Sequence, residues 1–176
     1  MTGAGVAEVV ARASAAAFGK PLVTNVLRGL LVEAIVASAV EADWVWCAAD
    51  YSSWDFERAD GLRLEVKQSS YRQTWAPPAS GKVSPGFDIR TRTGRWEGSK
   101  WIAEPGRAAH LYVFAYHDVR DETADHRDPA QWTFFVVPTL QLPLTGRIAL
   151  GAVRKLAKPI NISELFRNVT IIAGAN

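Results

Sequence analysis

The chain has 176 residues and reads as a single domain spanning 1–176, because no Ser-, Gly- or Pro-rich linker divides it into self-sufficient halves. Hydrophobic residues make up 48% and charged residues 22%, which excludes a chain disordered by composition. The formal charge of +2 is weak evidence for a polyanionic partner. One cysteine excludes an internal disulfide, and three scattered histidines argue against a zinc site, so any metal should have oxygen ligands.

The sequence predicts a protein without a membrane partner. The most apolar run, Gly29 to Val40, is interrupted by Glu33 and is shorter than the roughly 20 residues that span a bilayer. The first residues place Glu8 and Arg12 in an alanine-rich stretch and show no signal-peptide pattern. We therefore expect a cytoplasmic protein.

Two helices are predicted before the first strand. Residues 6–18 form an alanine-rich helix that is stopped by Gly19 and Pro21. A longer helix, capped by Thr24 or Asn25, runs to about residue 42, and valines lying off its apolar stripe predict packing on more than one side. The predicted stripe consists of Leu27, Leu30, Leu31, Ala34, Ile35 and Ser38.

From residue 44 onward, alternating and β-branched runs replace the helical period. They predict strands at Trp44–Ala48, Trp54–Arg58, Leu62–Ser69, Phe87–Arg90, Leu111–His117 and Trp132–Pro138. A charged loop separates the last two strands. The tail from Ser163 to about Ala173 fits a helix capped by Ser163, although its β-branched "VTII" leaves a strand possible. This order predicts an α/β (α+β mixed) fold, a central mixed β-sheet flanked by helices.

The turn between the second and third strands fixes which side chains meet. A two-residue Asp60-Gly61 loop would place Asp55 opposite Val66 and mix core with polar positions. A three-residue Ala59-Asp60-Gly61 loop, with glycine in the left-handed conformation, instead pairs Phe56 with Leu64 and Glu57 with Arg63. The same register pairs Trp54 with Val66 and sets Asp55 opposite Glu65.

Two carboxylates that face each other repel, so a positive charge is expected beside them. The candidates are a divalent cation and the ammonium of Lys67, two residues along the strand. Magnesium binds carboxylates, backbone carbonyls and waters. Asp55, Glu65 and the carbonyl of Val66 are therefore the expected metal ligands.

Asp55 followed by Glu65-Val66-Lys67, with Glu33 on an upstream helix and Gln68 after the lysine, resembles the PD-(D/E)XK nuclease superfamily. The resemblance covers residues 25–73, and Trp54 stands where the motif has proline. It implies a restriction-endonuclease-like core and metal-dependent hydrolysis of phosphodiester bonds. The expected substrate is DNA, as for an endonuclease of the restriction, defence or repair type. It further implies that Asp55 and Glu65 bind Mg²⁺, with Mn²⁺ as a substitute, and that Lys67 positions and activates the attacking water.

Other residues are weaker candidates for the site. Glu33 is either a metal or supporting carboxylate or the polar edge of a buried helix. Gln68 alternates toward the core, so a catalytic role needs a bulge or a strand end. Asp50 and Asp60 compete with Asp55, but Asp60 belongs to the turn and Asp50 precedes the hairpin.

The segment from Arg90 to Arg107 interleaves basic and aromatic residues in a way that suits phosphate contacts and base stacking. The sequence just after the lysine strand, "YRQTW", is also expected to border the substrate cleft. The predicted nucleic-acid contacts are Arg90, Arg92, Arg95, Lys100, Trp96 and Gln73.

Three readings stay open at this point. The acids and the lysine also fit an ordinary solvated strand face, and the same scaffold also suits a non-catalytic module that binds nucleic acid or protein. An RNA-directed or structure-specific nuclease is equally compatible, since no motif reads bases or a 2′-hydroxyl. A homodimer is expected if both strands of a duplex are cut.

Overall fold

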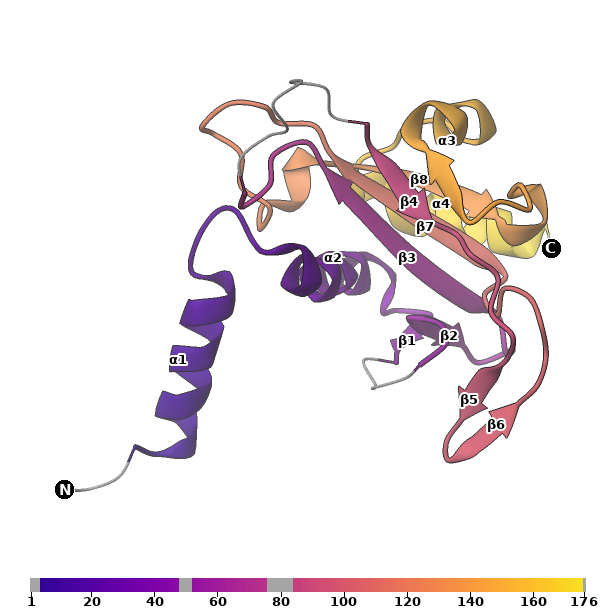
Figure 1. Cartoon of the computed structure of the whole chain (residues 1–176), viewed down its shortest axis with the longest axis horizontal. Helices are drawn as coiled ribbons and strands as arrows, with labels where there is room; N and C mark the ends of the chain where they lie inside the picture. Colours follow the sequence, from indigo (N-terminus) through magenta and orange to yellow (C-terminus); the bar gives the residue numbers. More distant parts are fainter. Residues whose placement is uncertain (1–3, 48–51, 76–83, 176) are drawn as a thin grey trace.

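A mixed sheet of five strands forms the centre of this computed structural model, which describes residues 4–47, 52–75 and 84–175. The strand order is β1-β2-β3-β7-β8, with β3 and β7 parallel and the other neighbours antiparallel (Figure 1). The predicted mixed sheet is therefore confirmed. The sheet strands are β1 (Trp44–Trp46), β2 (Phe56–Arg58), β3 (Arg63–Ser70), β7 (Leu111–His117) and β8 (Trp132–Pro138).

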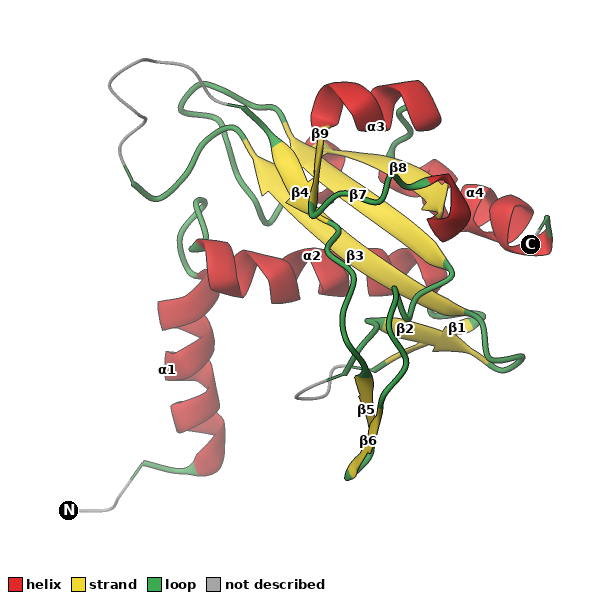
Figure 2. Cartoon of the chain, turned by 45° about the vertical axis from the view of Figure 1, so that its right-hand side comes forward, coloured by secondary structure: helices red, strands yellow, loops and turns green. Residues whose placement is uncertain are grey.

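Each face of the sheet is covered by a different set of elements (Figure 2). Helices α2 (Asn25–Val40) and α4 (Ile162–Gly174) pack on one face, where Leu64, Val66 and Val113 belong to one buried cluster. On the other face, the small sheet of β4 (Gly86–Asp88) and β9 (Arg147–Ala149) and helix α3 (Leu150–Leu156) pack over Phe114 and Phe135. Alternation along β3 and β7 separates the two clusters, because successive side chains point to opposite faces.

The buried side of α2 differs from the predicted stripe. Leu30 is 44% exposed and Ala34 is exposed, whereas the valines expected to lie off the stripe are buried. The reason is that α2 contacts both β3 and α4, and these two neighbours select a face that includes Val32, Val36 and Val40. The expectation of packing on more than one side is confirmed.

Several short elements lie outside the predicted set. No element was predicted for the hairpin strands β5 (Arg95–Glu97) and β6 (Lys100–Ile102), for strand β9 or for helix α3. The cap of helix α4 lies two residues earlier than predicted. Asn161, not Ser163, is its cap, and Asn161 and Glu164 form a capping box. Two 3-10 turns, at Pro129–Gln131 and Thr139–Gln141, flank β8.

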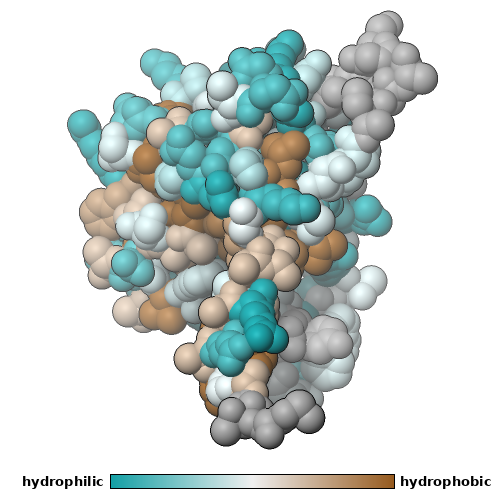
Figure 3. Space-filling model, turned by 90° about the vertical axis from the view of Figure 1, so that its left-hand side faces the viewer, coloured by the Kyte–Doolittle hydropathy of each residue, from teal (hydrophilic) through white to brown (hydrophobic). Residues whose placement is uncertain are grey.

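The first helix stands away from the sheet. Helix α1 (Val6–Phe18) has the predicted bounds, and it has no buried residue. Figure 3 shows it projecting below the rest of that face, mostly pale and brown around one hydrophilic patch. Among the described helices, none has the length and hydropathy that a membrane crossing requires.

Candidate active site

The hairpin of β2 and β3 has the predicted register. Phe56 pairs with Leu64 and Glu57 with Arg63, and the Arg58 N–H donates to the Leu62 carbonyl at 2.9 Å across the three-residue turn. Gly61 has φ = 85°, the left-handed conformation that the bulged turn requires. The turn residue Asp60 binds the Arg58 guanidinium and stays out of the site, as expected.

The regular pairing of β2 with β3 does not extend to Asp55, the residue that precedes β2. The predicted pair of Trp54 with Val66 does not form in the ladder, and Trp54 packs in the cluster opposite to that of Phe56. A bend over Ser53 to Asp55 reverses the alternation there. Trp54 thus lies beneath Arg63, whose guanidinium carbon is 3.9 Å from the indole centroid.

The bend changes how Asp55 reaches β3. Its N–H donates to the Leu64 carbonyl at 3.0 Å, and its carboxylate Oδ2 accepts the N–H of Val66 at 2.6 Å. Burial, together with the charges of Glu65 and Glu33, raises the pKa of Asp55 far above its usual range, although the Val66 N–H opposes this. Asp55 is therefore a half-buried acid fixed to the free edge of β3.

Glu65 and Lys67 lie two residues apart on the same face of β3 and form an ion pair. Their side chains are 16% and 27% exposed, so both are largely screened from solvent. Burial alone would lower the pKa of Lys67, but the charge and hydrogen bond of Glu65 and the charge of Asp55 outweigh burial and raise it. Lys67 remains an ammonium at neutral pH.

Glu33 approaches this edge from α2. It accepts a hydrogen bond from Trp46 Nε1 at 3.1 Å, and burial and the charge of Glu65 raise the pKa of Glu33 despite that bond. The charges of Glu65 and Glu33 both act on Asp55, and the charge of Glu65 acts on Glu33. The structure thus places Glu33 beside the predicted pair of acids, close enough to raise the pKa of Asp55.

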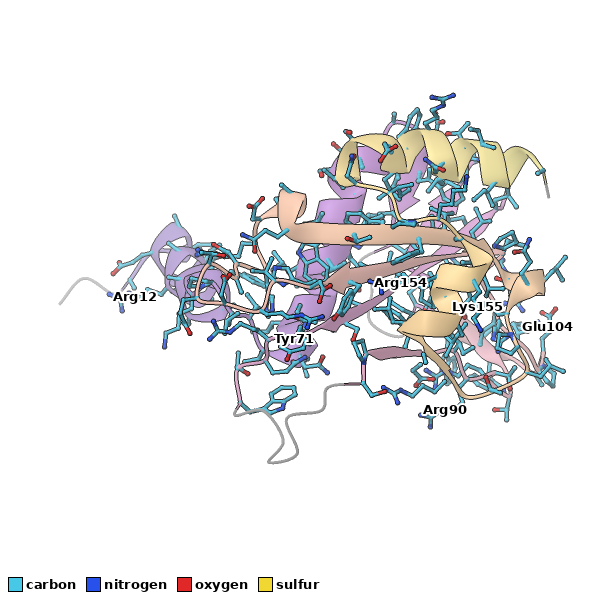
Figure 4. The ribbon with its side chains drawn as sticks, turned by 90° about the horizontal axis from the view of Figure 1, so that it is seen from above. Arg12, Tyr71, Arg90, Glu104, Arg154 and Lys155 are labelled. Carbon is cyan, nitrogen blue, oxygen red and sulfur yellow. The ribbon has the colours of Figure 1, made fainter. Side chains whose placement is uncertain are left out.

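A pocket of about 550 Å³ opens above Glu65 and Lys67. Four of the predicted nucleic-acid contacts, Arg90, Arg92, Arg95 and Trp96, line it together with the acid and the lysine. In Figure 4, Arg90 and Glu104 of this region lie at the end of the molecule opposite Arg12 of α1. The pocket lining also includes Trp101 and Arg107 of the predicted basic and aromatic segment, and four residues that the sequence did not indicate: Arg63, Asp88, His110 and Tyr112.

Other predicted residues lie elsewhere. Lys100 is exposed on β6 outside the pocket lining, and Gln73 donates from Nε2 to the Ser70 carbonyl at 2.6 Å. Gln68 faces α2, where its Oε1 accepts from Arg28 Nε at 2.7 Å and its Nε2 donates to Asn25 Oδ1 at 3.1 Å. Because β3 runs without a bulge to Ser70, Gln68 is not brought together with Lys67. Asp50, the competing acid, lies outside the described residues.

The oxygen donors present suit a hard cation. In residues 4–47, 52–75 and 84–175, no group of three or more His, Cys, Asp or Glu side chains is arranged to hold a metal ion. A metal shell would therefore combine the Asp55 and Glu65 carboxylates with backbone oxygen and water. The N–H and C=O of one strand residue point to the same edge, so the Val66 carbonyl points toward Asp55, as its N–H does.

A second polar cluster, buried near the C-terminal end of β3, was not predicted. His126 accepts from the Val23 N–H at Nδ1 (3.0 Å) and shares a hydrogen bond with Ser70 Oγ at Nε2 (2.9 Å). Burial, and then the nearby Arg28 and His117, lower the pKa of His126 to about 4. The cluster connects the charged loop after β7 to Val23, just before α2. The charged sequence of the loop did not indicate this buried contact.

No protein-family model matches the sequence, and no curated protein matches it either. Among solved structures, the chain is similar to a bacterial homing endonuclease, I-Ssp6803I. The two are 19% identical, the match covers 86% of this chain and 97% of that chain, and the TM-score is 0.44. At this distance, the likeness carries no argument about activity, which has to rest on the site.

Proposed function

We propose that this protein is a metal-dependent nuclease with a restriction-endonuclease-like core that hydrolyses phosphodiester bonds in DNA. The observation that carries the proposal is the position of Glu65 and Lys67 on one face of β3, inside a pocket that Arg90, Arg92 and Arg95 also line. Carboxylates beside an ammonium and a ring of guanidinium groups suit a reaction at a phosphate.

Asp55, Glu65 and the Val66 carbonyl would hold Mg²⁺, or Mn²⁺ in its place. When bound, such a cation lowers the pKa of water and stabilises negative charge on phosphate oxygens. The raised pKa of Asp55 supports this assignment, because closely placed carboxylates gain most from an added positive charge. Glu33 would reinforce the negative potential from the α2 side.

The chain's own groups have separate tasks in this reaction. Lys67, kept cationic by Glu65 and Asp55, would orient the attacking water and stabilise charge at the phosphate. The pocket arginines would hold the flanking phosphates. A bond forms between the water oxygen and phosphorus, the bond from phosphorus to the sugar oxygen breaks, and that oxygen takes up a proton.

The decisive test is Lys67→Ala assayed on supercoiled, linear and single-stranded DNA and on RNA, with and without Mg²⁺ or Mn²⁺. Cleavage should fall at least 100-fold, whereas Lys100→Ala, a lysine outside the pocket lining, should cleave like the parent. Calorimetry should show Mn²⁺ binding that Asp55→Asn abolishes. Equal cleavage by the parent and Lys67→Ala would refute the proposal.

A non-catalytic binding module is the alternative. It is favoured by the ion pair of Lys67 with Glu65, which compensates one carboxylate without any metal. Absence of Mn²⁺ binding together with retained DNA affinity would support this second reading. A homodimer stays a prediction, as does the cytoplasmic location.

A further inference from the structure

The hairpin of β5 and β6 forms one wall of the pocket and carries two exposed indoles. It is a separate two-stranded sheet that extends from the main sheet near β1 and β2 (Figures 1 and 2). Trp96 and Trp101 are directly paired in its register, with ring centroids 5.4 Å apart and planes at 65°. They are 44% and 46% exposed, although large aromatic side chains are usually buried.

The position of Trp101 is built into the backbone of the hairpin. A Cβ atom added at Gly94 would clash with the Ile102 carbonyl oxygen of β6 and would lie 2.6 Å from Trp101 Cζ2, well inside van der Waals contact. Glycine at this position lets the indole lie against the chain that leads into β5. The hairpin backbone therefore holds the two exposed indoles in one arrangement. A single methyl group added at Gly94 would change that arrangement.

Both indoles line the same pocket as Glu65 and Lys67. Tyr112, which is 5% exposed, also lines the pocket, as does Arg63, which stacks on Trp54. A pocket of about 550 Å³ lies in the size range of small-ligand sites and has room for a nucleotide. Bases inside a duplex are stacked on their neighbours and cannot enter it, so only an unpaired base can lie against these rings.

We propose that the substrate presents an unpaired nucleotide beside the scissile phosphate, and that Trp96 and Trp101 hold its base. This inference rests on the proposed nuclease function and specifies its substrate class: single-stranded, gapped or branched DNA in preference to continuous duplex. The arginines contact the backbone of either form, because phosphates are common to both. The indoles then supply the discrimination, since stacking needs a base that is free of its neighbours.

The test measures binding without cleavage. Lys67→Ala protein in EDTA is titrated with two oligonucleotides that place 2-aminopurine either in a short unpaired gap or in continuous duplex. Trp96→Ala and Trp101→Ala in this background should weaken gapped DNA about tenfold and duplex less than twofold. Binding should quench the fluorescence of 2-aminopurine in the gap, and this quenching should be smaller in the same two variants.

Three further variants serve as controls. Trp75→Ala removes an indole that is 56% exposed. The sequence placed Trp75 at the border of the cleft, but it does not line the pocket, so this variant should change neither affinity. Trp96→Phe keeps an aromatic face and should retain most of the preference for gapped DNA. Gly94→Ala keeps both indoles but displaces Trp101 together with the Ile102 backbone of β6, and it should reduce the preference for gapped DNA.

Equal weakening of both DNA forms by the tryptophan variants, or no weakening of either, would overturn the inference. Thermal midpoints of all variants show whether the fold is retained, and Trp96→Phe gives an answer if Trp96→Ala unfolds. Failure of the nuclease proposal has a different signature. In that case the parent protein cleaves none of the substrates with Mg²⁺ or Mn²⁺, whatever the tryptophan variants do in binding.

Discussion

The backbone N–H of Val66 donates to the Asp55 carboxylate across 2.6 Å, so the strand that carries Glu65 also holds the first acid of the site. The pairing of β2 with β3 ends at Leu64, and this bond forms on the same edge of β3, just beyond that residue. The arrangement fixes the distance between two carboxylates through one backbone amide. It also places Asp55 where an ionised carboxylate is costly, so the folded chain disfavours the charged form of this acid.

Asp55→Asn should therefore stabilise the fold while abolishing cleavage. The pKa of Asp55 is raised in the folded chain, so at neutral pH folding must either take up a proton or bury the charge, and both cost free energy. The amide has no charge to bury and can still accept the Val66 N–H. We expect a gain on the order of 1 kcal/mol in the free energy of unfolding. Urea unfolding and DNA cleavage measure the two effects, with Glu57→Gln, a partly exposed acid on β2, as the control. A destabilised Asp55→Asn protein would contradict this explanation.

The pocket arginines should set the salt dependence of DNA binding. Arg90→Ala together with Arg92→Ala should weaken binding and reduce the slope of log affinity against log salt by about 2, since each lost phosphate contact removes about 0.9. Arg12→Ala with Lys20→Ala removes the same charge at the α1 end of the chain and should leave the slope nearly unchanged. Anisotropy titrations from 50 to 300 mM salt give the slopes. Equal slopes for the two double variants would remove this surface from the site.

The buried His126 should make stability depend on pH. Its pKa is about 4 in the folded chain against an ordinary 6.5, so the unfolded chain binds more protons between these values. Stability is thus present above pH 6.5 and is lost as the pH falls toward 4. We expect a loss on the order of 2 kcal/mol between pH 7.5 and 5. Urea unfolding at both values should show a smaller difference for His126→Gln; an unchanged difference would assign the effect to other groups.

Gly61→Ala tests the hairpin turn that positions the acids. With φ = 85° and no heavy atom within 4 Å of an added Cβ, any cost comes from the backbone alone. The expected destabilisation is roughly 1–2 kcal/mol. Gly151→Ala, in α3 with equally open surroundings, should be neutral or stabilising because alanine favours a helix. Thermal unfolding of the two variants separates the outcomes, and similar shifts would show that the turn does not depend on Gly61.

Parts of the fold follow from local patterns. The strands 111–117 and 132–138 and the helix 6–18 have the predicted bounds, because their residues carry a clear period or a clear stop signal. Strand β9 and helix α3 have three and seven residues, too few to show a period, and the sequence did not indicate them. The prediction of the buried face of α2 was wrong. Two neighbours, β3 and α4, decide which face is buried, and the sequence of the helix contains no information about them.

The sequence by itself determined the β2–β3 hairpin and the shared face of Glu65 and Lys67, since alternation and a glycine turn are local properties. Only the tertiary structure decided the rest of the site. The bend that turns Trp54 to the other face depends on packing beyond the strand. Arg90, Arg92 and Trp96 line the same pocket as Lys67 because β4, which precedes them, packs over the sheet. Contacts between segments more than twenty residues apart depend on how layers pack, and no period within either segment records that packing.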